Sequence, residues 1–123
     1  SAQYAFDGSY STNWQAASGQ FAGSWVEVNF GANTAFNTVV LSEFGSRTSG
    51  FRIEYWNGSN WLTAATGTSI GSTATPSVHS FAAVTGSKAR IFYTAGSQQP
   101  ILYEFEVYNY IPPANLARNK TYA

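Results

Sequence analysis

The chain has 123 residues, about the length of one domain, so it leaves no room for a catalytic domain with an appended module. Charged residues make up only 10% of it, against a usual share of about 25%, and six Lys and Arg balance six Asp and Glu. A neutral surface lacks the electrostatic attraction that draws proteins to nucleic acids or anionic membranes. We therefore expect no nucleic-acid partner and no membrane partner.

Cysteine and methionine are both absent, which excludes a disulfide framework, a thiolate zinc site and a cysteine nucleophile. No apolar run approaches the roughly 20 residues of a membrane span, and the first residues lack the basic and apolar regions of a signal peptide. We expect a mature segment. Aromatic residues make up 17% of the chain, so we expect some of them to face outward or toward a ligand.

Short β-branched and aromatic runs are separated by Gly, Asn, Ser and Thr clusters at intervals of about 8–12 residues, which is typical of an all-β sandwich or barrel. The clearest strand is predicted at residues 25–30. Alternation there places Val26, Val28 and Phe30 on one face. We expect Gly31 to end this strand.

The following segments continue the β pattern. Residues 36–41 are apolar almost throughout, as in a strand covered on both sides, and residues 42–50 predict a loop. Residues 51–56 alternate cleanly and direct Arg52 and Glu54 outward.

A tight hairpin is predicted next, because Asn57 and Gly58 tolerate positive φ, and Trp61 begins the return strand. Residues 66–75 predict a small-residue loop. Further strands are expected at residues 78–83, 89–94 and 102–108. With one strand from a terminus the total is about eight, so the predicted fold is an all-β, two-sheet β-sandwich of the jelly-roll type.

Four segments together resemble the discoidin, or coagulation factor 5/8 type C, domains. They are residues 5–14 (AFDGSYSTNW), 23–31 (GSWVEVNFG), 51–61 (FRIEYWNGSNW) and 104–108 (EFEVY). Within that superfamily the chain is most similar to the family 32 carbohydrate-binding modules of secreted bacterial glycoside hydrolases and lyases. The resemblance implies one galactose-binding-domain-like sandwich over residues 1–123.

One motif is out of the family's order. Such domains usually open with a segment like Asn-Leu-Ala-x-x-Lys, whereas here a segment of this kind, residues 115–123 (NLARNKTYA), stands last. The chain is therefore either cut across a repeat boundary of a tandem array or circularly permuted. We expect residues 115–123 to supply the usual first strand, in their own domain or in a neighbour's, and we expect a monomer rather than a swapped dimer.

Asp7, the only Asp in the chain, lies in a Gly/Ser turn. Taken alone, an Asp-Gly pair usually caps its own turn. The family resemblance implies instead a structural Ca²⁺ site, since calcium takes about six to eight oxygen ligands. Its implied ligands are the carboxylates of Asp7 and Glu104, the carbonyls of Tyr4, Ser9 and Tyr103, and the carbonyl and hydroxyl of Thr12.

The resemblance also implies a saccharide site at one end of the sandwich, formed by loops at residues 15–21, 43–48 and 96–100. The polar candidates are Gln15, Glu43, Arg47, Gln98 and Gln99, and the aromatic candidates are Phe21, Phe44 and Tyr93. Aromatic faces cover the C–H patch of a pyranose, while amide, carboxylate and guanidinium groups meet its hydroxyls.

Each of these candidates has a structural alternative. In the structural alternative, Phe21 covers the edge of the core, and Arg47 and Glu43 pair with each other or with water rather than with a sugar. Gln15 stands where galactose-binding relatives often carry a His, so we expect a sugar other than galactose. By resemblance Trp14, Trp25 and Trp61 are packing residues. Trp56 shares the outward face with Arg52 and Glu54; we expect it to stack on Trp61, and the alternative is a second contact with a glycan.

Catalysis is not expected. Glu104 and Glu106 share a strand face about 7 Å apart, which overlaps the spacing of an inverting glycosidase pair, but nothing nearby would raise the pKa of either. His79 is the only His, the chain has no Cys, and its one Asp is Asp7, so we expect neither a zinc site nor a triad around His79.

The sequence thus predicts a non-catalytic carbohydrate-binding module of a larger secreted bacterial enzyme, located outside the cell. Its expected partners are an oligosaccharide or polysaccharide and neighbouring modules, with one structural Ca²⁺. The alternatives are a discoidin-like adhesion or protein-interaction domain and, ranked below it, a small lyase or hydrolase.

Overall fold

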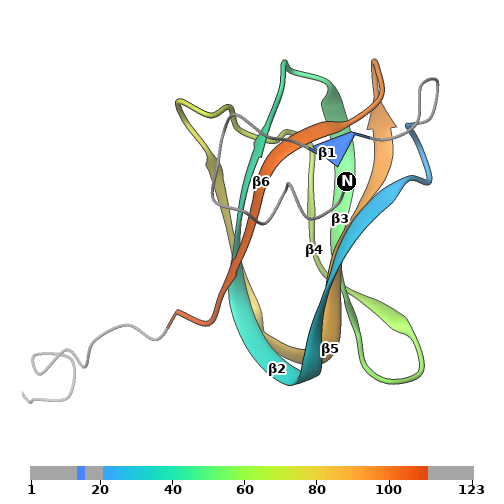
Figure 1. Cartoon of the computed structure of the whole chain (residues 1–123), viewed down its shortest axis with the longest axis vertical. Helices are drawn as coiled ribbons and strands as arrows, with labels where there is room; N and C mark the ends of the chain where they lie inside the picture. The colour runs from blue at the N-terminus through green and yellow to red at the C-terminus, as the bar shows by residue number, and fades with distance from the viewer. Residues whose placement is uncertain (1–13, 16–20, 111–123) are drawn as a thin grey trace, which may run out of the picture.

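The computed structural model describes residues 14–15 and 21–110, and the side chains of residues 21–110. Six strands form one antiparallel sheet in the order β1-β6-β2-β5-β3-β4 (Figure 1). They are β1 (Trp14–Gln15), β2 (Trp25–Glu43), β3 (Thr48–Trp56), β4 (Trp61–Gly67), β5 (Ser77–Gly96) and β6 (Ile101–Tyr108). Over this part of the chain, no helix has the length and apolar character needed to span a bilayer.

The sheet folds over on itself because β2 and β5 are bent and belong to two layers. Residues 25–29 of β2 pair with 88–92 of β5, whereas residues 38–41 pair with 77–80. β3 and β4 extend the first of these pairs, and β6 and β1 extend the second. We call these the first and the second layer. The predicted all-β sandwich is confirmed.

Gly31 does not end the first long strand, contrary to the sequence prediction. It adopts a φ of +82° within β2, and the register of β2 against β5 shifts between Asn29 and Thr34. A glycine in this region allows a bulge, at which a strand bends while it stays in its sheet. The predicted loop at 42–50 is also shorter than expected, since only residues 44–47 separate β2 from β3.

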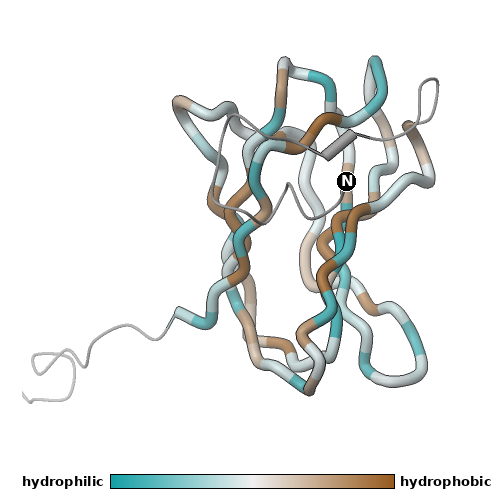
Figure 2. Tube along the Cα trace, viewed as in Figure 1, coloured by the Kyte–Doolittle hydropathy of each residue, from teal (hydrophilic) through white to brown (hydrophobic). Residues whose placement is uncertain are grey.

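The core lies between the two layers and follows the predicted alternation. Ile53 and Ile91 of the first layer and Val39 and Leu41 of the second are fully buried. Burial of each such side chain stabilises the fold by roughly 1.5–3 kcal/mol. Figure 2 shows the apolar residues recurring along the strands.

The outer face of the first layer carries a network of ions and rings. Arg52 and Arg90 donate from Nε to the two carboxylate oxygens of Glu54, at 3.0 and 2.8 Å. The Arg90 guanidinium lies 4.1 Å from the ring centroid of Trp61. Trp56 contacts Trp61 as predicted, with ring centroids 5.6 Å apart, but the ring planes are tilted by 57° rather than stacked. Residues 115–123, the predicted first strand, lie outside the described residues.

Replacement of Gly67 by Ala should destabilise the protein. A Cβ at Gly67 would overlap the ring of Phe51, which is buried in the core. We expect Gly67→Ala to lower the free energy of unfolding by about 1–3 kcal/mol, measured by urea denaturation. Combined with Phe51→Leu, it should cost less than the two changes added separately, because the clash is then relieved. If the losses in free energy of unfolding of the two single variants simply added up in the double variant, the predicted contact between residue 67 and the Phe51 ring would be contradicted.

His79 should make the stability depend on pH. Its ring meets Phe51 edge-on at 5.3 Å, its Nε2 lies 2.8 Å from Ser77 Oγ, and burial lowers its pKa below the ordinary 6.5. The unfolded chain therefore binds the proton more readily, and stability is lost as the pH falls from the unfolded-state pKa toward the lower folded-state value.

We expect the stability advantage of the parent over His79→Gln to shrink as the pH is lowered from about 8 to about 5, measured by urea unfolding. The raised pKa of Glu43 acts in the opposite sense, since it adds stability as the pH falls, but it is common to both proteins and cancels in the difference. A difference that is constant with pH would count against the buried, neutral imidazole.

Candidate functional site

Three connections meet at one end of the sandwich, in the upper part of Figure 1. We call them the loop end: residues 21–24 before β2, 44–47 between β2 and β3, and 97–100 between β5 and β6. Main-chain hydrogen bonds join the second connection to the third and to the start of β6, and tie the first to β5. Ser97 N donates to Arg47 O at 2.9 Å, Phe44 N donates to Ile101 O at 2.9 Å, and Gly23 N donates to Tyr93 O at 2.8 Å.

Arg47 links two of these connections through its side chain. Its Nη1 donates to the carbonyl oxygen of Gln99 at 3.0 Å. The guanidinium carbon lies 5.1 Å from the ring centroid of Phe44. Because a guanidinium has five N–H donors, this bond leaves others for the hydroxyls of a ligand. The same side chain can therefore shape the loop end and offer donors at its surface.

Phe44 is the most exposed aromatic ring of the loop end, with 47% of its surface accessible. Its ring makes an edge contact with Tyr103 of β6, with ring centroids 6.3 Å apart and an interplanar angle of 67°. The Arg47 guanidinium lies over the same ring. These two contacts hold the ring at the surface. It has the character of a stacking platform for a pyranose.

Glu43 is turned inward, unlike the exposed carboxylate that the sequence analysis expected. Only 3% of its surface is accessible, and its two oxygens accept hydrogen bonds from Thr48 Oγ1 at 2.7 Å and Thr48 N at 3.3 Å. Burial raises the pKa of Glu43, although the bonds from Thr48 and the charge of Arg47 oppose this rise. Its carboxylate supports the loop from within, and contact with a saccharide stays a prediction.

Phe21 and Tyr93 pack against each other, with ring centroids 5.8 Å apart. The Phe21 ring also lies directly over Gly96, where a Cβ would overlap it. Tyr93 is 1% exposed, so the prediction that it forms a platform is wrong; burial, with a smaller contribution from Glu43, raises its pKa. The structure places Phe21 at the edge of the core, as its structural alternative required.

The predicted amide side chains fall into three situations. Gln98 is exposed between β5 and β6, and Gln99 beside it is half-buried with its carbonyl on Arg47. The backbone of Gln15 pairs with Ile101 at the start of β6, next to these residues, while its side chain lies outside the described part. Gln98 is therefore the amide most open to a ligand.

The predicted metal ligands are only partly described. Tyr103 and Glu104 lie on β6, whereas Tyr4, Asp7, Ser9 and Thr12 lie outside the described residues. Glu104 is 3% exposed and stands opposite Ser42 of β2.

The Ser42 hydroxyl is fully buried and has no hydrogen-bond partner within the described chain. A buried carboxylate, a buried hydroxyl and a main-chain carbonyl are oxygen donors that suit Ca²⁺. Among the described residues no three His, Asp or Glu side chains cluster as a metal site by themselves.

Sequence reasoning placed no ligand on the outer face of the second layer, where the structure has a hollow of about 500 Å³. Tyr108 and Tyr110 line it, and both are exposed. The signal in the sequence was a pair of tyrosines, Tyr108 and Tyr110, separated by a single residue at the end of the last predicted strand.

An antiparallel sandwich with ligand-accessible loops at one end is the architecture of galactose-binding-like domains. The family model for F5/8 type C domains that is described as "NedA-like, galactose-binding domain" matches residues 4–91. The chain belongs to this family, and the resemblance to discoidin-like domains is confirmed. No curated protein matches the chain.

Three solved structures are similar over most of the chain. Chitosan-binding module 1 from a chitosanase/glucanase of Paenibacillus sp. IK-5 is 31% identical, with a TM-score of 0.73 over 88% of this chain and 84% of that one. Module 2 of that enzyme, in complex with chitotriose, is 26% identical, with a TM-score of 0.74 over 88% and 86%.

The third structure is the CBM32 of AlyQ in complex with 4,5-unsaturated mannuronic acid, which is 26% identical, with a TM-score of 0.76 over 89% and 86%. Four further similar structures are of much longer chains, of which this chain covers 21–25% at identities of 20–24%. These longer chains show the fold alone.

Proposed function

We propose that the protein is a non-catalytic carbohydrate-binding module whose loop end binds an oligosaccharide or polysaccharide. The observation that carries the proposal is the exposed Phe44 ring held beside the Arg47 guanidinium, on a loop joined to the connection that bears Gln98. An apolar ring face with planar donors around it is the chemistry by which proteins hold pyranose rings. Two of the similar structures contain a saccharide, chitotriose in one and unsaturated mannuronic acid in the other.

The arrangement of the described carboxylates supports a binding role rather than catalysis. A glycosidase needs two carboxyl groups facing one bond, about 5–9.5 Å apart. Beside the loop end, both oxygens of Glu43 are occupied by Thr48, and Glu54 lies in the ion network of the first layer. Neither is exposed as a general acid or base. Of the pair considered from the sequence, Glu104 is buried and Glu106 accepts a hydrogen bond from the Tyr108 hydroxyl.

The module would act by attaching an enzyme to its polysaccharide. We infer that it belongs to a larger secreted bacterial enzyme with neighbouring modules, and that it raises the concentration of that enzyme near its polysaccharide. The two chitosan-binding modules, which derive from one chitosanase/glucanase, support this inference. An adhesion or protein-interaction domain is the competing function, and glycan binding distinguishes the two.

Phe44→Ala should weaken saccharide binding about tenfold, because it removes the stacking face. The ring also contacts Tyr103 and Arg47, so urea unfolding checks that the variant is folded. The measurement is calorimetric titration with the tightest ligand found on a glycan array. Leu62→Ala, which truncates another exposed apolar residue in β4, should bind as the parent does. Equal affinity of Phe44→Ala and the parent would refute the loop-end site, and a blank array would favour the adhesion function.

We also propose one structural Ca²⁺, held by the Glu104 carboxylate and the Tyr103 carbonyl together with Tyr4, Asp7, Ser9 and Thr12. Such an ion would bind the folded state alone, so its removal with EGTA should lower the melting temperature. A free calcium concentration of about 100 times Kd would raise the free energy of unfolding by about 2.7 kcal/mol. Glu104→Gln should melt lower and lose its response to added calcium. Melting of the parent that is unaffected by EGTA would remove the ion from the proposal.

A further inference from the structure

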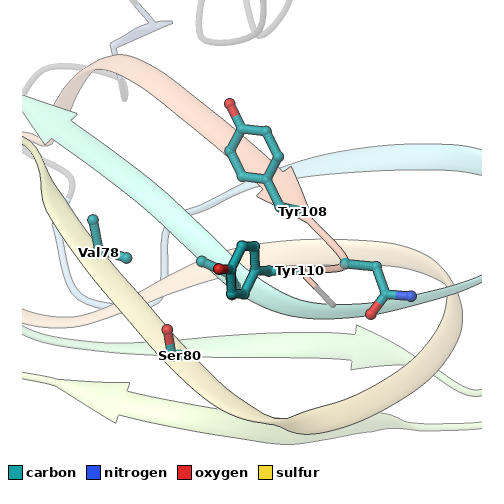
Figure 3. A pocket seen from close by; sticks show the side chains of 6 residues that line it. Val78, Ser80, Tyr108 and Tyr110 are labelled. Atoms are coloured by element: carbon teal, nitrogen blue, oxygen red, sulfur yellow. The ribbon is translucent and has the colours of Figure 1, made fainter. Parts of the chain in front are cut away.

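The outer face of the second layer has a hollow of about 500 Å³, within the size range of small-molecule sites. We call it the tyrosine hollow. Figure 3 shows Val78 and Ser80 of β5 on one side of it, with Tyr108 and Tyr110 contributed by the end of β6 and the residues after it. Its lining residues are Thr38, Val78, Ser80, Tyr108, Asn109 and Tyr110.

The register of three strands builds the floor of the hollow. Thr38 of β2 stands opposite Ser80 of β5 on one side and opposite Tyr108 of β6 on the other. Since successive residues of a strand face opposite sides of the sheet, these three side chains point away from the core. Their neighbour Val39 is fully buried on the inner side. The sheet therefore presents two hydroxyls and a phenol in one row.

Apolar surface is unusually open here. The exposed fractions are 64% for Val78, 59% for Tyr110 and 48% for Tyr108, which makes these the more exposed of the large apolar residues that the structure describes. A contiguous apolar patch of this kind on a monomeric domain generally marks a site of interaction.

The two tyrosines are held in place by neighbouring polar groups. Asn37 Nδ2 donates to the Tyr110 carbonyl at 2.7 Å, and Tyr110 N donates to Asn37 Oδ1 at 2.8 Å. The Tyr108 hydroxyl donates to the carboxylate of Glu106. The backbone of Tyr110 and the ring of Tyr108 are thus fixed before a ligand binds, which lowers the conformational entropy lost on binding.

We propose that the tyrosine hollow is a second saccharide site, which takes a neutral stretch of an oligosaccharide or polysaccharide. None of its lining side chains is charged, and the neighbouring Glu106 carboxylate already accepts a hydrogen bond from the Tyr108 hydroxyl, so the lining itself favours an uncharged partner. Two phenol rings, two hydroxyls and one amide instead match the C–H faces and hydroxyls of a neutral sugar. The site shares its ligand class with the proposed function but does not require the loop end to be occupied.

The position of the hollow separates it from the loop end. β6 begins beside the loop end at Ile101 and finishes in the hollow at Tyr108. At about 3.3 Å per residue, the strand puts about 23 Å between them. One polymer chain that engages both sites would be retained more strongly than by either site alone.

Affinity electrophoresis of the full chain through gels containing neutral polysaccharides (mixed-linkage β-glucan, xylan and galactomannan) tests the proposal. We expect Tyr108→Ala and Tyr110→Leu to weaken binding about tenfold at the hollow, and so to reduce the retardation that remains in a Phe44→Ala background. Leu62→Ala is the matched control. Urea unfolding checks the fold, and Tyr110→Leu retains the backbone bonds to Asn37.

The outcomes separate the two sites. If Phe44→Ala reduces retardation and the tyrosine variants match the parent in every gel, the hollow is refuted and the loop end stands. If only the tyrosine variants reduce retardation, the hollow stands and the loop end is refuted. A parent that no gel retards overturns the hollow, whereas the loop end, whose saccharide need not be neutral, is then decided by the glycan array.

Two other occupants would also overturn the proposal. Self-association in sedimentation velocity that the tyrosine variants abolish would assign the hollow to a second copy. NMR cross-peaks between residues 111–123 and the ring of Tyr108 in the free protein would show the chain filling it.

Discussion

The pairing of β2 with β5 is the constraint on which the described structure depends, because this pair alone among the described strands continues through both layers. Each strand descends one layer, turns the corner and ascends the other. The last residues of both, Glu43 and Gly96, therefore arrive at the same end of the sandwich. The connections that leave them, 44–47 and 97–100, must meet there. The bends of β2 and β5 at the opposite end of the sandwich therefore bring these two connections together at the loop end.

Much of this fold could be predicted from alternation alone. Residues 25–30 and 51–56 alternate with a period of two, and Val26, Phe51 and Ile53 of the predicted inner faces are buried. Glu54, predicted to face outward, is also buried, because Arg52 and Arg90 cover its carboxylate. The continuity of β2 could not be predicted in this way, since Gly31 reads equally well as a strand end or as a bulge. The pairing of β2 with β5 on both sides of Gly31 is what decides between them. The inward turn of Glu43 likewise depends on Thr48, which a sequence pattern of exposed polar loop residues does not reveal.

The candidate sites were harder to predict because their contacts span the chain. Phe44, Arg47 and Gln98 were found as residue types, through resemblance and loop position. The bond from Arg47 to the Gln99 carbonyl joins residues 52 positions apart, and no local pattern indicates it. The tyrosine hollow needs Thr38, Ser80 and Tyr108 to fall into one row, which follows from register alone.

The loop end is held together largely through main-chain groups, which has an evolutionary consequence. The bonds from Ser97, Phe44 and Gly23 use amide nitrogens and carbonyl oxygens that every residue except proline supplies in full. Substitution of the side chains there would alter which ligand is favoured while the scaffold persists. Recognition can therefore diverge among descendants of such a module without first sacrificing foldability.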